Sequence, residues 1–117
     1  MLYVVPTPLG NLEDMTSRAL RTLKESSVVF CEDTRRTRNL MSHFGIPTPL
    51  ERYDENDVRS VDKLMDRLRR GQSVCLVSDG GLPGVSDPGR RAVAAARREG
   101  LPVTALPGPC AAATAVA

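Results

Sequence analysis

Short apolar runs alternate along the chain with longer segments in which apolar residues recur at every third or fourth position. The runs predict strands at residues 2–5, 28–31, 74–77 and 102–106, and residues 50–53 are a candidate for a further short strand. The helical spacing predicts helices at residues 17–25, 34–44, 58–70 and 88–99. Because strands and helices alternate with short connections, the sequence predicts an α/β fold, with an open, mainly parallel sheet flanked by helices.

Capping residues and glycines set the predicted ends of these helices. Thr16 is a suitable N-cap for the first helix, and Asp87 followed by Pro88 predicts the start of the last one. Glycine stops are predicted at Gly45, Gly71 and Gly100. The alanine-rich residues 111–117 keep a helical pattern without a C-cap, so we expect residues 1–117 to be one domain of a longer protein.

Three loops rich in proline and glycine follow predicted strands, at residues 6–11, 78–84 and 107–110. Open α/β sheets bind ligands at the carboxyl ends of their strands, which predicts one ligand site built from several strand ends. Gly80 and Gly81 would let a ligand approach the backbone, and Asp79 supplies an acceptor suited to a ribose or an amino-acid moiety. The alternative is that glycine and proline only shape the connections.

Composition and charge narrow the class of protein. The 117 residues, 41% hydrophobic and 26% charged, are typical of one globular domain. No apolar stretch approaches the roughly 18 residues of a membrane span, and the amino terminus lacks a signal-peptide pattern, so we expect a cytoplasmic protein without a membrane partner. The net charge of +2 is too small to indicate nucleic-acid binding by itself.

The sequence argues against several common kinds of functional site. Neither G-x-G-x-x-G after a strand nor G-x-x-x-x-G-K-[ST] is present, which argues against the usual dinucleotide and nucleoside-triphosphate sites. A single histidine, His43, argues against a Ser/His/Asp triad. The three cysteines lack Cys-x-x-Cys spacing, which predicts small buried hydrophobes and no metal site: Cys31, Cys75 and Cys110.

The densest polar segment, residues 31–38, follows a predicted strand and combines two carboxylates with three arginines. In one interpretation, Glu32 and Asp33 position and deprotonate a hydroxyl while the arginines hold phosphates. In the other, Asp33 or Thr34 caps the following helix and the arginines form a solvated face. Composition alone leaves both interpretations open.

Four segments, in this order, resemble the motifs of a known family: residues 2–12 with Asp14 and Thr16, residues 31–35, residues 77–81 with 86–89, and residues 106–112. The family is that of the bacterial small-subunit ribosomal RNA methyltransferases I, within the tetrapyrrole methylase superfamily. The resemblance extends over almost the whole chain. It implies that this chain is the amino-terminal α/β domain of such an enzyme and that a second domain of the parent protein is absent.

The resemblance implies transfer of a methyl group from S-adenosylmethionine to a ribose 2′-hydroxyl of small-subunit ribosomal RNA, by a full-length homodimer. It implies a donor site in a cleft between the two domains, so that this chain alone holds at best half of the pocket. The donor-binding positions that it implies are Leu9, Gly10, Ser78, Asp79, Gly80, Gly81, Pro107, Gly108, Cys110 and Ala111. The active-site positions are Glu32, Asp33 and Arg35, and the RNA-binding positions are Arg35, Arg36 and Arg38.

Two departures from the family pattern keep other functions open. Residues 53–56 read Tyr-Asp-Glu-Asn where the family usually has histidines beside an asparagine, and Leu82 stands where the family commonly has threonine. One alternative is a methyltransferase of the same superfamily that acts on a tetrapyrrole or another small molecule, because a fold does not fix its acceptor. The other is a domain that binds the donor without catalysis.

Overall fold

The computed structural model describes residues 1–7, 12–79 and 89–106, and its elements alternate as the sequence predicts. The strands are β1 (Leu2–Thr7), β2 (Val28–Cys31), β3 (Leu50–Arg52), β4 (Val74–Asp79) and β5 (Val103–Ala105). The helices are α1 (Ser17–Glu25), α2 (Thr34–His43), α3 (Val58–Arg69) and α4 (Arg90–Arg98), with a 3₁₀ turn at Leu12–Asp14.

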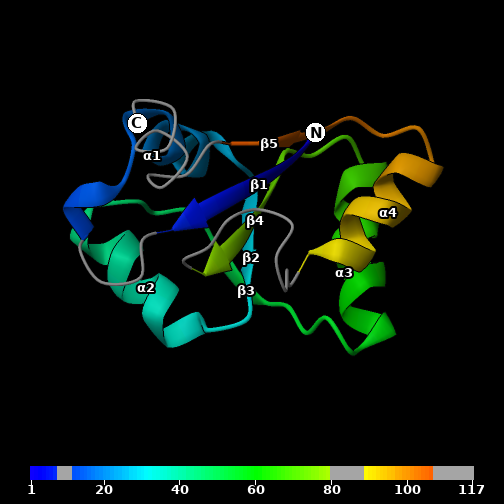
Figure 1. The fold of residues 1–117 in the computed structure, drawn as a ribbon, viewed down its shortest axis with the longest axis horizontal. Coiled ribbons are helices and arrows are strands. Elements are labelled where there is room, and N and C mark those ends of the chain that lie inside the picture. The colour runs from blue at the N-terminus through cyan, green and yellow to red at the C-terminus, as the bar shows by residue number, and fades with distance from the viewer. Residues whose placement is uncertain (8–11, 80–88, 107–117) are drawn as a thin grey trace, which may run out of the picture.

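The five strands form one sheet in the order β3-β2-β4-β1-β5, and every pairing is parallel. β1 lies between β4 and β5, with Val5 opposite Val77 and Leu2 opposite Val103. This arrangement confirms the predicted fold class. Parallel strands need crossover connections, and here each crossover contains one of the four helices (Figure 1).

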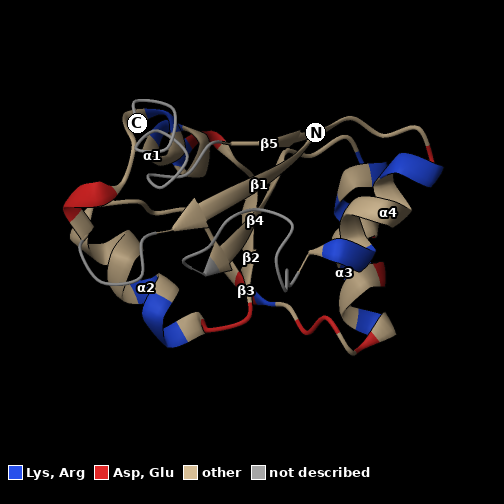
Figure 2. Cartoon of the chain, in the orientation of Figure 1, with Lys and Arg blue, Asp and Glu red and all other residues tan. Residues whose placement is uncertain are grey.

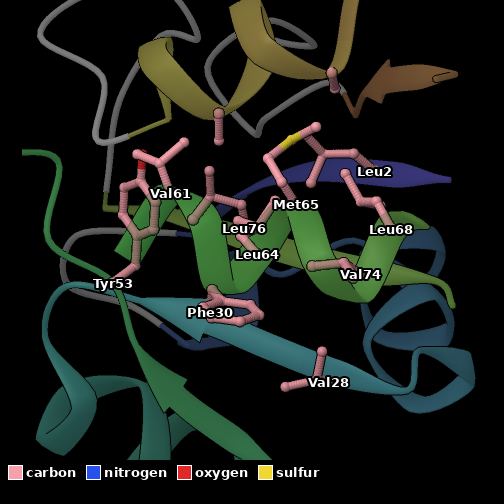
Figure 3. Close-up of a cluster of buried hydrophobic side chains, with 12 residues drawn as sticks. Leu2, Val28, Phe30, Tyr53, Val61, Leu64, Met65, Leu68, Val74 and Leu76 are labelled. Atoms are coloured by element: carbon pink, nitrogen blue, oxygen red, sulfur yellow. The ribbon is translucent and has the colours of Figure 1, made fainter. Parts of the chain in front are cut away.

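The helices cover both faces of the sheet, as parallel sheets require. α1 and α2 pack on one face, and α3 and α4 pack on the other (Figure 1). The α3–α4 face contains the larger buried cluster, in which Phe30 of β2 and Leu76 of β4 lie with Leu64 and Met65 of α3 (Figure 3). The central strands β1, β2 and β4 therefore have apolar residues on both sides, which explains why they read as apolar runs in the sequence.

Polar side chains close the amino ends of three helices. The Thr16 side chain accepts a hydrogen bond from Ala19 N at 3.1 Å, which confirms the predicted cap of α1. Asp33 caps α2 and Asp57 caps α3 in the same manner. The predicted glycine stops are also confirmed, because all three have positive φ: Gly45 at 66°, Gly71 at 82° and Gly100 at 72°.

The predicted start of the last helix is wrong. α4 begins at Arg90 with Gly89 as its N-cap, whereas the sequence predicts a start at residue 88 capped by Asp87. Asp87 and Pro88 lie outside the described residues. Gly89 is buried against Leu76: a Cβ atom at this position would lie 2.5 Å from Leu76 Cδ2. The residue before α4 must therefore lack a side chain, because the chain passes close to β4 here. The capping residues of the local sequence give no information about this contact.

The first strand continues through Pro6, where the sequence predicts an end at residue 5. Backbone groups of even-numbered residues in β1 face β5, since Leu2 N donates to Pro102 O and Val4 O accepts from Leu106 N. Pro6 is the next residue of this series and lies beyond the last β1–β5 residue pair, Val4 with Ala105. Its missing N–H therefore removes no bond of the sheet, while β1 still pairs with β4 as far as Thr7.

Candidate functional site

The neighbouring strands β1 and β4 are followed by helices on opposite faces of the sheet. From β1 the chain proceeds to α1 on one face of the sheet, and from β4 it proceeds to α4 on the opposite face (Figure 1). Such a switch point is where open α/β sheets bind ligands. Thr7 pairs with Asp79 there, and Thr7 Oγ1 donates a hydrogen bond to Ser78 O at 3.3 Å. Thr7 and Ser78 are both buried, so this bond fixes the two strand ends side by side.

Only part of the predicted donor site falls within the described residues. Ser78 is buried near the end of β4, and Asp79 is the last residue of that strand. Leu106 follows β5 and donates its N–H to Val4 O, so the three predicted loops start from the adjacent strands β4, β1 and β5. The remaining predicted positions lie outside the described residues, as does Leu82: Leu9, Gly10, Gly80, Gly81, Pro107, Gly108, Cys110 and Ala111.

The acidic pair lies at the carboxyl end of the next strand, β2, which pairs with β4. Glu32 and Asp33 are both exposed there. Asp33 Oδ1 accepts a hydrogen bond from Arg36 N at 3.0 Å, which confirms that Asp33 caps α2. A carboxylate has two oxygens, so a cap formed by Oδ1 is compatible with a second role for Oδ2. The catalytic role of this pair stays a prediction.

The three predicted RNA-binding arginines lie on α2, directly after the acidic pair. Arg35 and Arg38 are exposed, and Arg36 is partly buried. Figure 2 shows basic positions on α2 next to the acidic segment that leads into it. Since a helix that follows a parallel strand starts at the carboxyl edge of the sheet, Arg35 and Arg36 lie at the same edge as Thr7 and Ser78.

The sequence does not predict a link between the segment after β3 and the start of α4. The fully buried Tyr53 donates its hydroxyl hydrogen to Glu55 Oε1 at 2.7 Å. Glu55 Oε2 in turn accepts from Arg91 N at 3.1 Å, so Glu55 supplies the side-chain cap that Gly89 cannot give. Burial and the Glu55 hydrogen bond raise the pKa of Tyr53 well above its usual range. The two residues belong to the segment where the sequence departs from the family pattern.

Replacing Glu55 by alanine should lower the free energy of unfolding by about 1–2 kcal/mol, because α4 loses its N-terminal acceptor and the buried Tyr53 hydroxyl loses its own. Urea unfolding of the two proteins measures the difference. Glu25→Ala is a suitable control, since this exposed carboxylate lies in the last turn of α1. Equal unfolding free energies for Glu55→Ala and Glu25→Ala would contradict the assigned cap.

The described cysteines behave as buried hydrophobes. Cys31 and Cys75 are reduced thiols and fully buried, which confirms the prediction for these two; Cys110 lies outside the described residues. The Cys75 sulfur lies 2.7 Å from Ser26 Oγ, and burial raises the pKa of Cys75 to about 11. His43 is exposed at the end of α2 and contacts the Phe44 ring edge to face, with centroids 4.8 Å apart.

The buried Cys75 thiol predicts a loss of stability in alkali. Its pKa is about 11 in the folded protein and 9.0 in an ordinary environment, so above pH 9 the unfolded state loses the proton first. The unfolding free energy should therefore fall as pH rises from 9 to 11, by about 2 kcal/mol in total. Urea unfolding at pH 8, 9 and 10 tests this, with Cys75→Ala as reference. Parallel pH curves for the two proteins would contradict the prediction.

Within the described residues, no group of three or more histidine, cysteine or acidic side chains is arranged to hold a metal ion. The helices of the same part of the chain are too short or too polar to cross a bilayer.

Sequence comparison relates the chain to a family of methyltransferases. The sequence model of the family described as Tetrapyrrole (Corrin/Porphyrin) Methylases matches residues 1–117. The chain is 49% identical to Ribosomal RNA small subunit methyltransferase I of Halalkalibacterium halodurans, and 47% identical to the protein of the same name from Escherichia coli O157:H7. These alignments cover 98% of this chain but only 40% and 41% of the two relatives.

Solved structures show the same likeness. The native form of Uroporphyrin III C-methyl transferase from Thermus thermophilus superposes with a TM-score of 0.71 at 28% identity, over 92% of this chain and 48% of that one. A structure of Uroporphyrin-III C-methyl transferase from the same organism, complexed with S-adenyl homocysteine, gives a TM-score of 0.70, also at 28% identity, over 92% of this chain and 44% of that one. The chain thus spans less than half the length of these relatives.

Proposed function

Because the chain belongs to the tetrapyrrole methylase family, we propose that it is the amino-terminal domain of an S-adenosylmethionine-dependent methyltransferase that acts on a ribose 2′-hydroxyl of small-subunit ribosomal RNA. The observation that carries this proposal is identity of 47–49%, over nearly the whole chain, to proteins named for methylation of that RNA. The second domain, the full-length homodimer and the cytoplasmic location belong to the same proposal.

The switch point between β1 and β4 suits the methyl donor. The hydrogen bond from Thr7 to Ser78 holds two strand ends together, and the chain leaves them toward opposite faces of the sheet. Backbone amides and carbonyls are exposed where such strands end, and they can bind the hydroxyl and amino groups of a nucleoside bearing an amino acid. The bound donor supplies a methyl group on a sulfonium, which is already activated for displacement. The protein therefore contributes chiefly by positioning the two reactants.

The acidic pair and the arginines of α2 suit the acceptor. Glu32 and Asp33 are exposed at the end of β2, one strand away from the Thr7–Ser78 pair by way of β4. We assign to Asp33, or to Glu32 beside it, the orientation or deprotonation of the ribose hydroxyl. Arg35, Arg36 and Arg38 would contact RNA phosphates, which makes binding dependent on salt concentration.

A second acceptor class has specific support. Two of the structural neighbours are named as uroporphyrin methyltransferases, so a tetrapyrrole acceptor is the alternative within the same family. The higher identity to the ribosomal RNA enzymes favours RNA, at 47–49% against 28%. A non-catalytic domain that binds the donor alone is the remaining alternative.

Incubation of the full-length protein with radiolabelled S-adenosylmethionine separates these functions. One reaction contains small ribosomal subunits from a strain that lacks the corresponding methylation, and a second contains a uroporphyrinogen. We expect label in the RNA, at a ribose that then resists alkaline cleavage on its 3′ side. Label in a base or in the tetrapyrrole would contradict the proposed acceptor, and no label in either would favour the non-catalytic alternative.

A further inference from the structure

The charges of this chain are strongly segregated between its elements. Residues 58–70 and 90–99, which contain α3 and α4, have nine basic and three acidic side chains. The remainder of the chain has seven basic and eleven acidic side chains. The net charge of +2 therefore combines a basic α3–α4 face with an acidic remainder, which a whole-chain count conceals.

The arginines of the two helices differ in their partners. Four arginines of the α3 segment form ion pairs, for example Arg67 with Glu51 at 2.7 Å and Arg69 with Glu99 at 2.7 Å. The four arginines of α4 are all exposed, and in the described part of the chain no side chain forms an ion pair with them: Arg90, Arg91, Arg97 and Arg98. The α4 arginines are therefore the ones available to an anion.

Helix stability does not explain two of these arginines. Arg97 and Arg98 lie in the last turn of α4, where positive charge interacts favourably with the helix dipole. Arg90 and Arg91 lie in the first turn, where positive charge is unfavourable by roughly 0.3–1 kcal/mol for each residue, and this turn has no acidic residue of its own. Glu55 accepts a hydrogen bond from the backbone N–H of Arg91, but among the described residues no side chain forms an ion pair with the Arg90 or Arg91 guanidinium, so both can bind an anion from outside.

Two of the α4 arginines line a groove between α3 and α4. Its volume is about 430 Å³, its floor includes Val61 and Met65, and Arg91 and Arg98 line its α4 side. Its other charged lining residues are the paired Arg69 and Glu99, and Asp62. Arg91 and Arg98 are seven residues apart, about 10 Å along the helix axis. Figure 2 shows basic positions at both ends of α4, separated by the uncharged residues 92–96.

The start of this basic surface lies at the same edge of the sheet as the candidate site. α4 follows β4 and α2 follows β2, so both helices begin at the carboxyl edge, on opposite faces of the sheet. On the premise of the proposed function, we infer that the exposed arginines of α4 bind phosphates of the same ribosomal RNA. The RNA backbone then contacts the domain on both faces of the sheet, at α4 as well as at Arg35, Arg36 and Arg38 of α2.

RNA binding by the full-length protein tests this inference. The probe is unmodified small-subunit ribosomal RNA transcribed in vitro, and binding is measured across a series of salt concentrations. The variant is Arg91→Gln with Arg98→Gln, and the matched control is Arg18→Gln with Arg21→Gln, two exposed arginines of α1. Losing two phosphate contacts should weaken binding about 10- to 30-fold at 0.15 M salt and lower the slope of log K against log salt by about 1.5.

The design separates this inference from the proposed function. The control should keep the wild-type slope, and Arg91→Lys with Arg98→Lys should bind within about threefold of wild type, since lysine retains the charge. If the α4 variant keeps the wild-type slope while the wild-type protein methylates ribosomal RNA, the inference alone is wrong. If the wild-type protein methylates no ribosomal RNA, the proposed function fails, whatever the variant binds.

Discussion

Methyl transfer to ribosomal RNA should fall by about 100-fold or more in full-length Asp33→Asn, with the affinity for S-adenosylmethionine nearly unchanged. A positioned acid or base contributes typically 10²- to 10⁴-fold to such a step, and asparagine cannot accept the hydroxyl proton. Asparagine is as good an N-cap as aspartate, so its side-chain oxygen can still accept from Arg36 N. The substitution therefore removes the proposed chemistry and keeps the structural role.

Two further variants complete this experiment, which measures initial rates with undermethylated small subunits. Asp33→Ala removes the cap as well, so it should lose the same activity and also about 1 kcal/mol of unfolding free energy. Glu25→Gln, at the far end of α1, should retain wild-type activity. Wild-type turnover by Asp33→Asn would restrict Asp33 to its capping role and leave Glu32 as the remaining carboxylate of the pair.

Gly89→Ala should destabilise the protein by about 1–3 kcal/mol, although its φ of −130° is accessible to alanine. The added Cβ would lie 2.5 Å from Leu76 Cδ2, a distance that real contacts do not reach. Leu76 is 1% exposed at the centre of the larger buried cluster, so its side chain cannot turn away without displacing its neighbours (Figure 3). Urea unfolding measures the effect.

A double-mutant cycle identifies the cause of that loss. Valine at position 76 has no Cδ atoms, so Gly89→Ala should cost little in a Leu76→Val background, and the two substitutions should show a coupling of about 1 kcal/mol or more. Strictly additive effects would show that the loss of unfolding free energy does not come from the contact with Leu76.

Features set by neighbouring residues were predicted well from the sequence. Thr16 and Asp33 accept hydrogen bonds from N–H groups three residues later, and each glycine stop lies two residues after the last residue of its helix. The continuous apolar runs at β2 and β4 follow from burial on both faces of a parallel sheet. These signals are local, so no knowledge of the tertiary structure was needed.

Features that depend on distant contacts were missed. Glu55 caps a helix that begins 35 residues later in the chain, and nothing within one helical turn of Arg90 announces that partner. The strand that contains Pro6 extends further than predicted because β5 ends opposite Val4, which only the sheet order reveals. The basic surface of α3 and α4 was also missed, because the sequence does not show that these two helices pack on the same face of the sheet.

The position of β1 in the sheet has a consequence for folding during translation. Both hydrogen-bonding neighbours of this strand, β4 and β5, are encoded far downstream, with Leu2 opposite Val74 and Val103. A ribosome that adds about 5–20 residues per second needs about 4–14 s to make the intervening part of the chain before β4 can pair. Through that interval β1 is an apolar segment whose backbone groups are not paired with another strand, the kind of segment that chaperones bind and that favours aggregation. We therefore expect the yield of folded protein to depend on translation rate and on chaperones that bind nascent chains.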